Sequence, residues 1–316
     1  MRVNAKSLLK QAMFSIYKCC EKMGVHILPV HYYSPVSNLR ELKKTTALWQ
    51  KKSALPGLYI DLDEQVNNMR EICLKYQEEY KENKAYKFAV EHKFGLGYGY
   101  IEAQALHGVI RHYKPKRIVE VGSGVSTWCM INAVKLNKEE TGEQCEINCV
   151  EPHPSNALKS FSEIKLIEKT VQSVSYEDVF EKLTDNDMLF IDSSHAVKPG
   201  SDVNYLILEI LPRLKAGTIV HFHDIYIPYD YKPAVLKSVF DWTETSLLRA
   251  FLIHNDRAKI IFCEFHLHCE RPDDMKKVFP EYKPRGLNNG VEDINYRHYQ
   301  DNSSSHRPSS IFLKMQ

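Results

Sequence analysis

Residues 117–127 read RIVEVGSGVST, and this stretch decides the fold class. The run from 118 to 121 is apolar except for Glu120, as expected for a short buried strand. Gly122 and Gly124 then allow the backbone to turn sharply and to approach a ligand closely. Apolar residues between 127 and 134 favour a helix after the turn. The stretch therefore predicts a strand, a glycine turn and a helix in succession.

The same alternation continues through the rest of the chain. Short apolar runs predict further strands at residues 146–150, 166–171, 188–191, 218–222, 259–265 and 310–314. Helical patterns occupy residues 203–214, where apolar residues recur every three or four positions, and residues 234–251. Strands that alternate with helices build parallel βαβ units. We therefore expect an α/β fold with a Rossmann-like, doubly wound, mostly parallel seven-stranded sheet and an N-terminal helical extension.

The chain divides into two predicted parts. Residues 1–90 form a helical cap or extension, and residues 91–316 form the domain that holds the sheet. Within the extension, apolar residues at helical spacing predict one helix over 62–82. The domain opens with a glycine-punctuated loop at 94–99. Residues 268–308 are rich in charge, proline, asparagine and serine, and we expect a long insertion there that forms either a substrate lid or a mobile loop.

The overall composition is that of an ordinary globular protein. The 316 residues are 43% hydrophobic and 26% charged, and their formal net charge is +2, so no nucleic-acid partner is expected. The charge is uneven, because residues 1–52 carry ten Lys or Arg against Glu21 and Glu41. This leaves +8 in that segment and −6 in the rest. We expect a solvated basic face, and the alternative is contact with an anionic partner or surface.

Eight cysteines occur, and no two form a CxxC pair. Several lie in apolar runs, as reduced core cysteines do, so a reducing, cytoplasmic compartment is expected. No apolar run approaches the roughly 18 residues of a membrane-spanning helix, and Lys10 with Gln11 interrupts the apolar stretch that a signal peptide needs. Residues 7–17 favour an amphipathic helix that packs on the domain, with peripheral membrane contact as the alternative.

Two acidic residues mark the predicted ligand crevice. Glu120 lies beside the glycine turn, where its carboxylate suits a positively charged ligand and repels a pyrophosphate. A dinucleotide fingerprint needs a third glycine, and Thr127 stands in its place. Glu151 follows the second predicted strand, where an acidic residue accepts hydrogen bonds from ribose hydroxyls. The pair predicts a site for a cationic nucleoside.

Polar side chains also follow the strands predicted at 188–191 and 218–222. Asp192 and His195 come after the first of these strands, and His223 and Asp224 after the second. Adjacent parallel strands end at one edge of a sheet, so we expect the four side chains near one crevice. Carboxylates and imidazoles bind divalent cations, and histidine serves as a general base near neutral pH. Both roles remain open, beside that of hydrogen-bonded core residues.

These residues resemble those of the class I S-adenosylmethionine-dependent methyltransferases and, more narrowly, methyltransferase family 24. That family has Asp-x-x-His after one strand, Asp at a helix start and His-Asp after the next strand. The matching residues here are Asp192, His195, Asp202, His223 and Asp224. The ExGxG turn and the ribose-binding acid are matched by Glu120, Gly122, Gly124 and Glu151. The resemblance covers residues 94–265 and the last strand.

The resemblance implies S-adenosylmethionine as the cofactor. The residues that it assigns to the methionine side are Glu120, Gly122, Ser123, Gly124, Ser126 and Thr127. Glu151 is expected to hold the ribose, Ser173 to lie near the adenine, and Asp192 to close the methyl end. The third small position of the turn is Ser126 or Thr127 instead of glycine, so we expect shifted contacts to the methionine end.

The resemblance further implies methyl transfer to a small-molecule acceptor, with a hydroxyl favoured. The candidate catalytic residues are His195, His223 and Asp224, and the candidate ligands of Mg²⁺ or another divalent cation are Asp192, His223 and Asp224. Related metal-dependent enzymes carry two acidic or amide residues where His223 and Asp224 stand, so a metal-free general base remains an alternative. A nicotinamide-dependent oxidoreductase and a cofactor-binding pseudoenzyme are the alternative functions. The pattern specifies neither the acceptor nor the oligomeric state.

Overall fold

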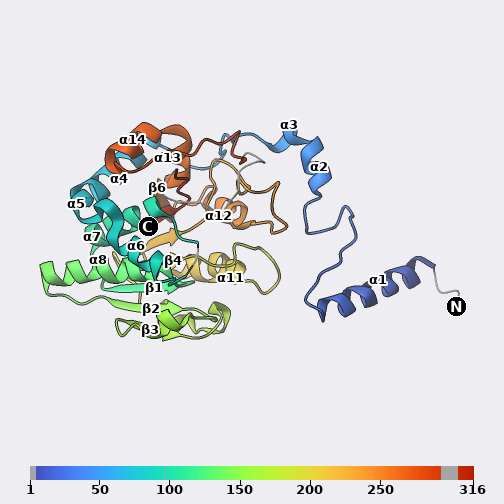
Figure 1. Ribbon diagram of the computed structural model, residues 1–316, viewed down its shortest axis with the longest axis horizontal. Helices are drawn as coiled ribbons and strands as arrows, with labels where there is room; N and C mark the ends of the chain where they lie inside the picture. The colour runs from blue at the N-terminus through green and yellow to red at the C-terminus, as the bar shows by residue number, and fades with distance from the viewer. Residues whose placement is uncertain (1–4, 96, 293–304) are drawn as a thin grey trace.

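The computed structural model describes residues 5–95, 97–292 and 305–316, in which a seven-stranded sheet carries helices on both faces (Figure 1). The strands are β1 (Arg117–Val121), β2 (Glu146–Val150), β3 (Ile164–Ile167), β4 (Met188–Ile191), β5 (Ile219–Phe222), β6 (Ala258–Cys263) and β7 (Ile311–Met315). Their order is β3-β2-β1-β4-β5-β7-β6. Strands β1 to β5 pair in parallel, whereas β7 is antiparallel to β5 and β6. The predicted doubly wound, mostly parallel sheet is confirmed.

The helices divide between the N-terminal segment and the connections of the sheet. Before β1 they are α1 (Ala5–Glu21), α2 (Leu39–Lys44), α3 (Thr46–Trp49), α4 (Leu62–Cys73), α5 (Gln77–Tyr80), α6 (Lys84–Glu91) and α7 (Tyr100–Tyr113). After β1 they are α8 (Val125–Thr141), α9 (Asn156–Lys159), α10 (Tyr176–Val179), α11 (Asp202–Asn204), α12 (Glu244–Leu252), α13 (Glu264–Glu270) and α14 (Pro272–Val278). A π-helical turn at Tyr205–Ile210 and a 3-10 turn at Leu211–Arg213 extend α11.

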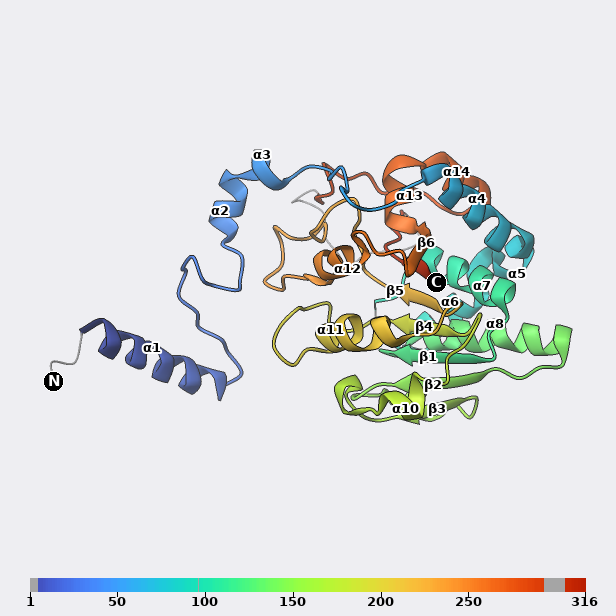
Figure 2. The ribbon, with the colours of Figure 1, turned by 180° about the vertical axis from the view of Figure 1, so that it is seen from behind.

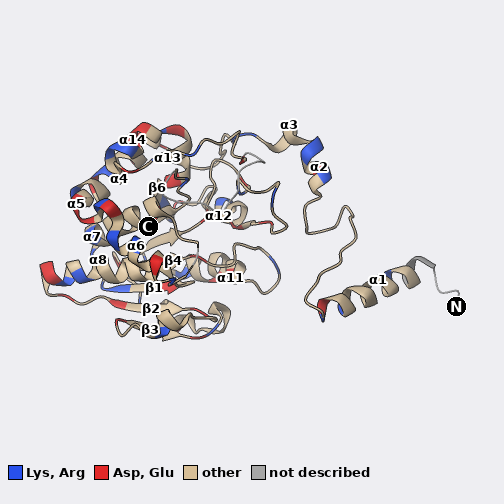
Figure 3. Cartoon of the chain, viewed as in Figure 1, with Lys and Arg blue, Asp and Glu red and all other residues tan. Residues whose placement is uncertain are grey.

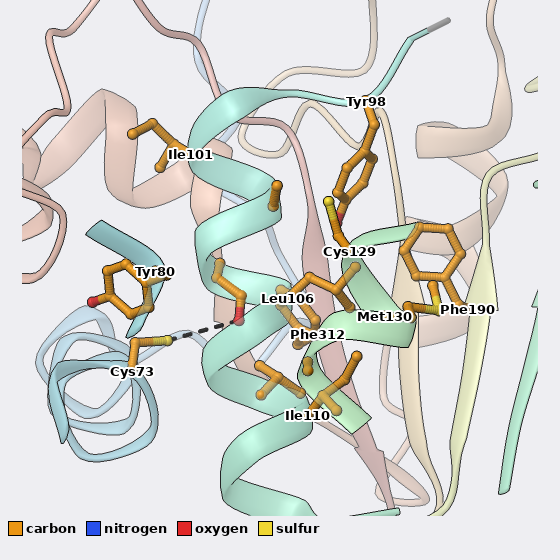
Figure 4. Packing of buried hydrophobic residues seen from close by; sticks show 14 of the residues in the cluster. Cys73, Tyr80, Tyr98, Ile101, Leu106, Ile110, Cys129, Met130, Phe190 and Phe312 are labelled. Atoms are coloured by element: carbon orange, nitrogen blue, oxygen red, sulfur yellow. Dashed lines mark hydrogen bonds between the residues drawn. The ribbon is translucent and has the colours of Figure 1, made fainter. Parts of the chain in front are cut away.

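The strands send alternate side chains into two cores, one on each face of the sheet. Ile118 and Phe190 enter the core that α4, α7 and α8 cover, whereas Leu189 enters the core on the other face. Figure 4 shows the first core, where Leu106 of α7 lies among side chains of α8 and the sheet. Burying one such side chain stabilises the fold by roughly 1.5–3 kcal/mol. The two cores hold the central strands, and with them the strand ends, in fixed positions.

The first core runs across the expected domain boundary at residue 90. Helix α4 packs so closely on α7 that a Cβ atom at Gly108 would lie 2.8 Å from the sulfur of Cys73. Phe279 and Tyr282, which follow α14, are also fully buried in this core. The described part of the expected lid therefore contributes side chains to the core. Residues 293–304 of that segment lie outside the described residues.

Two predicted helices differ from the observed ones. The helix expected over 62–82 ends at Cys73 and continues as short turns, with Glu82 in the left-handed region at φ 61°. The helix expected over 234–251 begins only at Glu244. Before it, the hydroxyl of Ser238 accepts a hydrogen bond from the backbone of Phe240 (3.0 Å). Such side-chain bonds satisfy the backbone locally and compete with helix formation.

Helix α1 stands apart from the sheet and its covering helices (Figures 1 and 2). Its exposed apolar side chains include Leu8, Leu9 and Ile16, at 54%, 63% and 55%. The expectation that this amphipathic helix packs on the domain is therefore wrong. No described helix has the length and apolar character to cross a bilayer.

The glycine turn after β1 leaves no room for a side chain at position 122. At Gly122 φ is 80°, and an added Cβ would lie 1.8 Å from the carbonyl oxygen of Asp192. Gly142 has a similar φ of 75° with no atom within 4 Å of its Cβ position. We predict that Gly142→Ala costs about 1–2 kcal/mol from the left-handed backbone. Gly122→Ala should cost more than about 3 kcal/mol, because the Asp192 backbone must also move. Urea unfolding of both variants measures the difference, and equal costs would contradict the close contact.

Candidate active site

The glycine turn joins the ends of β1, β2 and β4. The backbone N–H of Gly122 donates to the carbonyl of Val150 (3.1 Å), and the N–H of Asp192 donates to the carbonyl of Val121 (2.9 Å). Helix α8 starts directly after Gly124, which lies against Gly95 of the glycine-punctuated loop. The start of α8 therefore faces the crevice beyond the carboxyl ends of the strands, where ligands of doubly wound sheets bind.

Glu120 does not line this crevice, in contrast to the sequence-based expectation. Its side chain is fully buried, and its oxygens accept hydrogen bonds from Ser126 (2.7 Å), Thr127 (2.6 Å) and the thiol of Cys149 (3.2 Å). Thr127 in turn accepts a bond from the N–H of Gly124 (3.0 Å). Burial raises the pKa of Glu120 to about 7 against these hydrogen bonds, which lower it. Glu120, Ser126 and Thr127 therefore form a buried hydrogen-bond network that stabilises the glycine turn.

Glu151 lies at the tip of β2 and faces the turn. Its carboxylate accepts hydrogen bonds from the backbone N–H groups of Ser123 (3.3 Å) and His153 (2.8 Å), and it is half-buried. The structure therefore brings Glu151 and the glycine turn together, as the sequence predicts. Ser173 lies on an exposed turn, where its hydroxyl donates to the carbonyl of Thr170 (2.8 Å). Its place near an adenine stays a prediction.

Asp192, His195, His223 and Asp224 form one cluster at the ends of β4 and β5. Nε2 of His195 lies 3.3 Å from Asp192 Oδ1 and 3.7 Å from Asp224 Oδ2. Nδ1 of His223 lies 3.3 Å and 3.4 Å from the same two oxygens. The expectation that these four side chains share one crevice is confirmed. His195 and Asp224 adopt left-handed backbone conformations, at φ 58° and 57°, and strain of this kind gathers at functional sites.

Two carboxylates that were not predicted from the sequence each bind one of the imidazoles, at the nitrogen that points away from the cluster. Nδ1 of His195 donates to Glu244 (2.8 Å), and Nε2 of His223 donates to Glu102 (3.1 Å). Both carboxylates are buried. Glu244 starts α12 and Glu102 lies in the first turn of α7, so neither follows a strand end. Glu102 is one of several polar residues of α7, which also holds Gln104 and Arg111, so no local sequence signal marks either carboxylate as part of the cluster.

Asp224 and Glu102 share a further partner, Ser309. The hydroxyl of Ser309 donates to Asp224 Oδ1 (2.9 Å), and its backbone N–H donates to Glu102 Oε1 (2.7 Å). Tyr226 also donates to Asp224 Oδ1 (2.6 Å). Because Asp224 Oδ1 is held in this way, Oδ2 is the atom that faces the two histidines. The segment just before β7 therefore completes the cluster.

The carboxylates of the cluster favour the protonated form of both imidazoles and so raise the pKa of each. Burial disfavours the charged form of His195, but its hydrogen bonds with Asp192 and Glu244 raise its pKa to about 10. The pKa of His223 is also raised, since the nearby carboxylates of Asp224 and Asp192 outweigh its burial. The same histidines hold the pKa of Asp192 well below its usual range. The expectation of histidines that titrate near neutral pH is therefore wrong for this state of the cluster.

In the described part of the chain, no three His, Cys, Asp or Glu side chains already converge as metal ligands. The histidines and aspartates of the cluster instead form ion pairs with one another. Nδ1 of His223 is nevertheless buried without a hydrogen-bond partner, because its contacts with the two carboxylates lack hydrogen-bond geometry. An unsatisfied buried nitrogen that faces two carboxylate oxygens is an arrangement that a cation would satisfy.

Comparison with known proteins gives three findings. Residues 119–225, from β1 to just after the cluster, match a family model described as a methyltransferase domain. An uncharacterised protein of Archaeoglobus fulgidus is 31% identical over 175 residues, which cover 52% of this chain and 77% of that protein. The crystal structure of the Podospora anserina methyltransferase PaMTH1 with bound S-adenosylhomocysteine has a TM-score of 0.35 and 18% identity, and the match covers 75% of this chain and 93% of that one.

The buried carboxyl group of Glu120 makes a prediction for stability. Because its pKa is about 7 in the folded protein and about 4.5 ordinarily, the folded state keeps a proton that the unfolded chain has lost between these values. The free energy of unfolding from this group therefore falls as the pH rises through that window. In the wild type, this effect lowers the free energy of unfolding by at most about 3 kcal/mol between the two pKa values. We predict that Glu120→Gln removes this pH dependence.

The measurement is urea unfolding of the wild type and of Glu120→Gln at about pH 5 and about pH 8. The exposed Glu209→Gln variant is the matched control, and its difference from the wild type should not change between the two pH values. A Glu120→Gln difference that is the same at both pH values would show that the carboxyl group does not titrate in this range.

Proposed function

This chain belongs to the S-adenosylmethionine-dependent methyltransferases, and we propose that it methylates a hydroxyl group of a small molecule. The observation that carries the proposal is the cluster of Asp192, His195, His223 and Asp224 at the ends of β4 and β5. This cluster lies next to the glycine turn that follows β1. Carboxylates and imidazoles there suit the binding and deprotonation of a hydroxyl. The family match decides against the nicotinamide oxidoreductase.

The residues at the glycine turn fit a sulfonium nucleoside. Glu151 is half-exposed at the tip of β2, and each of its oxygens keeps acceptor capacity beyond the single backbone bond that it makes. Ser193, next to Asp192, has a buried hydroxyl without a partner. When bound, S-adenosylmethionine supplies a methyl group that is already activated by the positive sulfur. Glu151 would hold its ribose, and Asp192 would lie toward the methyl end.

A cavity of about 160 Å³ adjoins the cluster and is a suitable acceptor pocket. Its lining includes His223, Asp224, Tyr98, His306 and two arginines, Arg285 and Arg307. A cavity of about 150 Å³ holds a benzene ring, so the space matches an acceptor group of about one ring. The polar lining favours an acceptor that carries hydroxyl or acidic groups. Such positioning of two reactants can by itself lower a barrier by several kcal/mol.

Asp224 is the best placed of the three candidate catalytic residues to accept the proton of the hydroxyl. It lines the cavity, and its Oδ1 is held by Ser309 and Tyr226. The neighbouring carboxylates raise the pKa of His195 and of His223 and so favour their protonated forms, which are poor proton acceptors. They instead supply positive charge beside Asp224, which favours the ionised form of an acceptor oxygen.

The same four side chains are the candidate ligands of a divalent cation, although they do not form a preformed metal site in the described part of the chain. Ligands of one tetrahedral ion, with bonds of about 2.0–2.2 Å, lie about 3.3–3.6 Å apart. Three of the nitrogen–oxygen distances in the cluster, at 3.3, 3.3 and 3.4 Å, fall in this range, and the distance of 3.7 Å between His195 Nε2 and Asp224 Oδ2 lies outside it. Two imidazole ligands favour Zn²⁺ or another nitrogen-binding ion over Mg²⁺. A cation there would act as a Lewis acid on the acceptor oxygen. Glu102 and Glu244 would orient the two imidazoles, as outer carboxylates do around metal-bound histidines.

The first prediction concerns Glu151. Replacing Glu151 with Ala should weaken the binding of S-adenosylhomocysteine by about tenfold to a hundredfold, because hydrogen bonds to a charged group are lost. Isothermal titration calorimetry measures the affinity. Glu163→Ala removes a carboxylate from an exposed position just before β3 and should leave the affinity unchanged. Equal affinities for the two variants would exclude the ribose role.

Substitution of His223 tests whether the cluster acts in methyl transfer and not in cofactor binding. His223→Ala should abolish methyl transfer while S-adenosylhomocysteine binds nearly as in the wild type. Loss of that binding would instead indicate a structural role.

The metal content of the purified protein and titration with Zn²⁺ test the cation independently of activity. Glu244→Gln should weaken Zn²⁺ binding by about tenfold to a hundredfold, whereas His153→Ala, outside the cluster, should not. Identical Zn²⁺ binding by the wild type and His223→Ala would exclude a cation in the cluster.

A further inference from the structure

The N-terminal arm, residues 8–36, lies outside the methyltransferase domain. Figure 2 shows α1 separated from the sheet and its covering helices. The hydrogen bonds and ring contacts of the arm join residues within it. The first link to the domain is the bond from the backbone of Ser37 to Asp241 (2.8 Å). Nothing on the domain therefore covers the arm in the part of the chain that the structure describes.

Helix α1 is amphipathic. At 100° per residue, Leu8, Leu9 and Ile16 fall within one third of the helix circumference, and Ala12 and Met13 extend this face. Lys10 and Lys18 fall on the opposite side. Phe14 is the exception, since its ring lies among the charged residues, where the ammonium group of Lys18 stands 4.9 Å from the ring centroid.

The apolar surface continues after the helix. Ile27, Leu28 and Pro29 form a mainly apolar groove of about 570 Å³ together with Met13, Phe14, Ile16 and Tyr17, and Lys10 also lines it. Met23 and Val30 are exposed at 69% and 81%. A contiguous exposed apolar surface of this kind marks an interaction site. An isolated helix of 17 residues is also only marginally stable in water, so α1 gains stability when its apolar face is buried.

The charge of the segment indicates what covers it. Residues 1–52 carry +8, and this charge includes Lys10, Lys18 and Lys22 of the arm against Glu21. It also includes a basic cluster of Arg40, Lys43 and Lys44 on α2, beyond the arm (Figure 3). Basic residues around an apolar helix face are typical of helices that lie in the surface of an anionic membrane. There, the apolar side chains enter the boundary of the acyl chains, and each nearby lysine contributes attraction to acidic headgroups.

We propose that the N-terminal arm docks the protein onto an anionic lipid surface. Helix α1 lies in the plane of the headgroups, with Leu8, Leu9 and Ile16 turned toward the acyl chains and Lys10, Lys18 and Lys22 toward the phosphates. The domain then remains outside the bilayer, joined through the chain at Ser37. The acidic remainder of the molecule, with a charge of −6, is repelled by the same surface and leaves the arm as the contact.

The test is co-sedimentation of the full-length protein with lipid vesicles. We expect binding to vesicles of phosphatidylcholine mixed with phosphatidylserine, little binding to phosphatidylcholine alone, and release at high salt. Lys10→Gln and Lys18→Gln should each weaken binding by about fivefold. The double variant Leu9→Asp/Ile16→Asp should abolish it. Its melting temperature and its affinity for S-adenosylhomocysteine should stay at the wild-type values, because the arm makes no contact with the domain core.

A matched control keeps the result specific to the arm. Leu208→Asp makes the same chemical change at a leucine of the domain that is 53% exposed, and it should leave vesicle binding intact. Equal binding to neutral and anionic vesicles, or none to either, would overturn the proposal. So would a concentration-dependent dimer that the double variant dissociates in the absence of vesicle binding, since a second copy would then cover the arm.

Discussion

The close contact between the turn after β1 and the turn after β4 is the constraint on which the rest of the site depends. The carbonyl of Asp192 occupies the space that a side chain at position 122 would need. Because of this contact, Asp192 is fixed beside the glycine turn. The glycine-turn side of the crevice, with Glu151, and the polar cluster at the ends of β4 and β5 are thereby held next to each other.

Buried carboxylates organise both halves of the site. Glu120 is surrounded by the hydroxyls of Ser126 and Thr127 and the thiol of Cys149, and it shapes the turn that faces the crevice. Glu102 and Glu244 do the same for the two histidines of the cluster. Burying a carboxylate is unfavourable unless its oxygens are hydrogen-bonded. The hydrogen bonds of these carboxylates therefore help to position the donors, although one oxygen of Glu244 is buried without a partner.

Unlike the helices of the domain, α1 in the N-terminal arm does not pack its apolar face on the sheet. This helix has the apolar periodicity of a helix that is packed on a core, and periodicity alone predicted such packing. In the structure, the cores on both faces of the sheet are already covered by other helices, and α1 stands apart from them. The pattern of a helix specifies that one face must be buried, and it does not specify against what.

The sequence by itself determined the succession of strands, the glycine turn and the polar residues at the strand ends, because these features depend on local spacing and on the alternation of side chains. Two strand bounds were wrong, since the strand expected at 166–171 is Ile164–Ile167 and the strand expected at 259–265 ends at Cys263, after which α13 begins. It also placed Asp192, His195, His223 and Asp224 together, since adjacent parallel strands end at one edge. Only the tertiary structure decided that Glu120 turns inward and that Glu102 and Glu244 reach the histidines. Those two contacts span 121 and 49 residues of the chain. They depend on how α7 and α12 pack around the sheet, which no local pattern encodes.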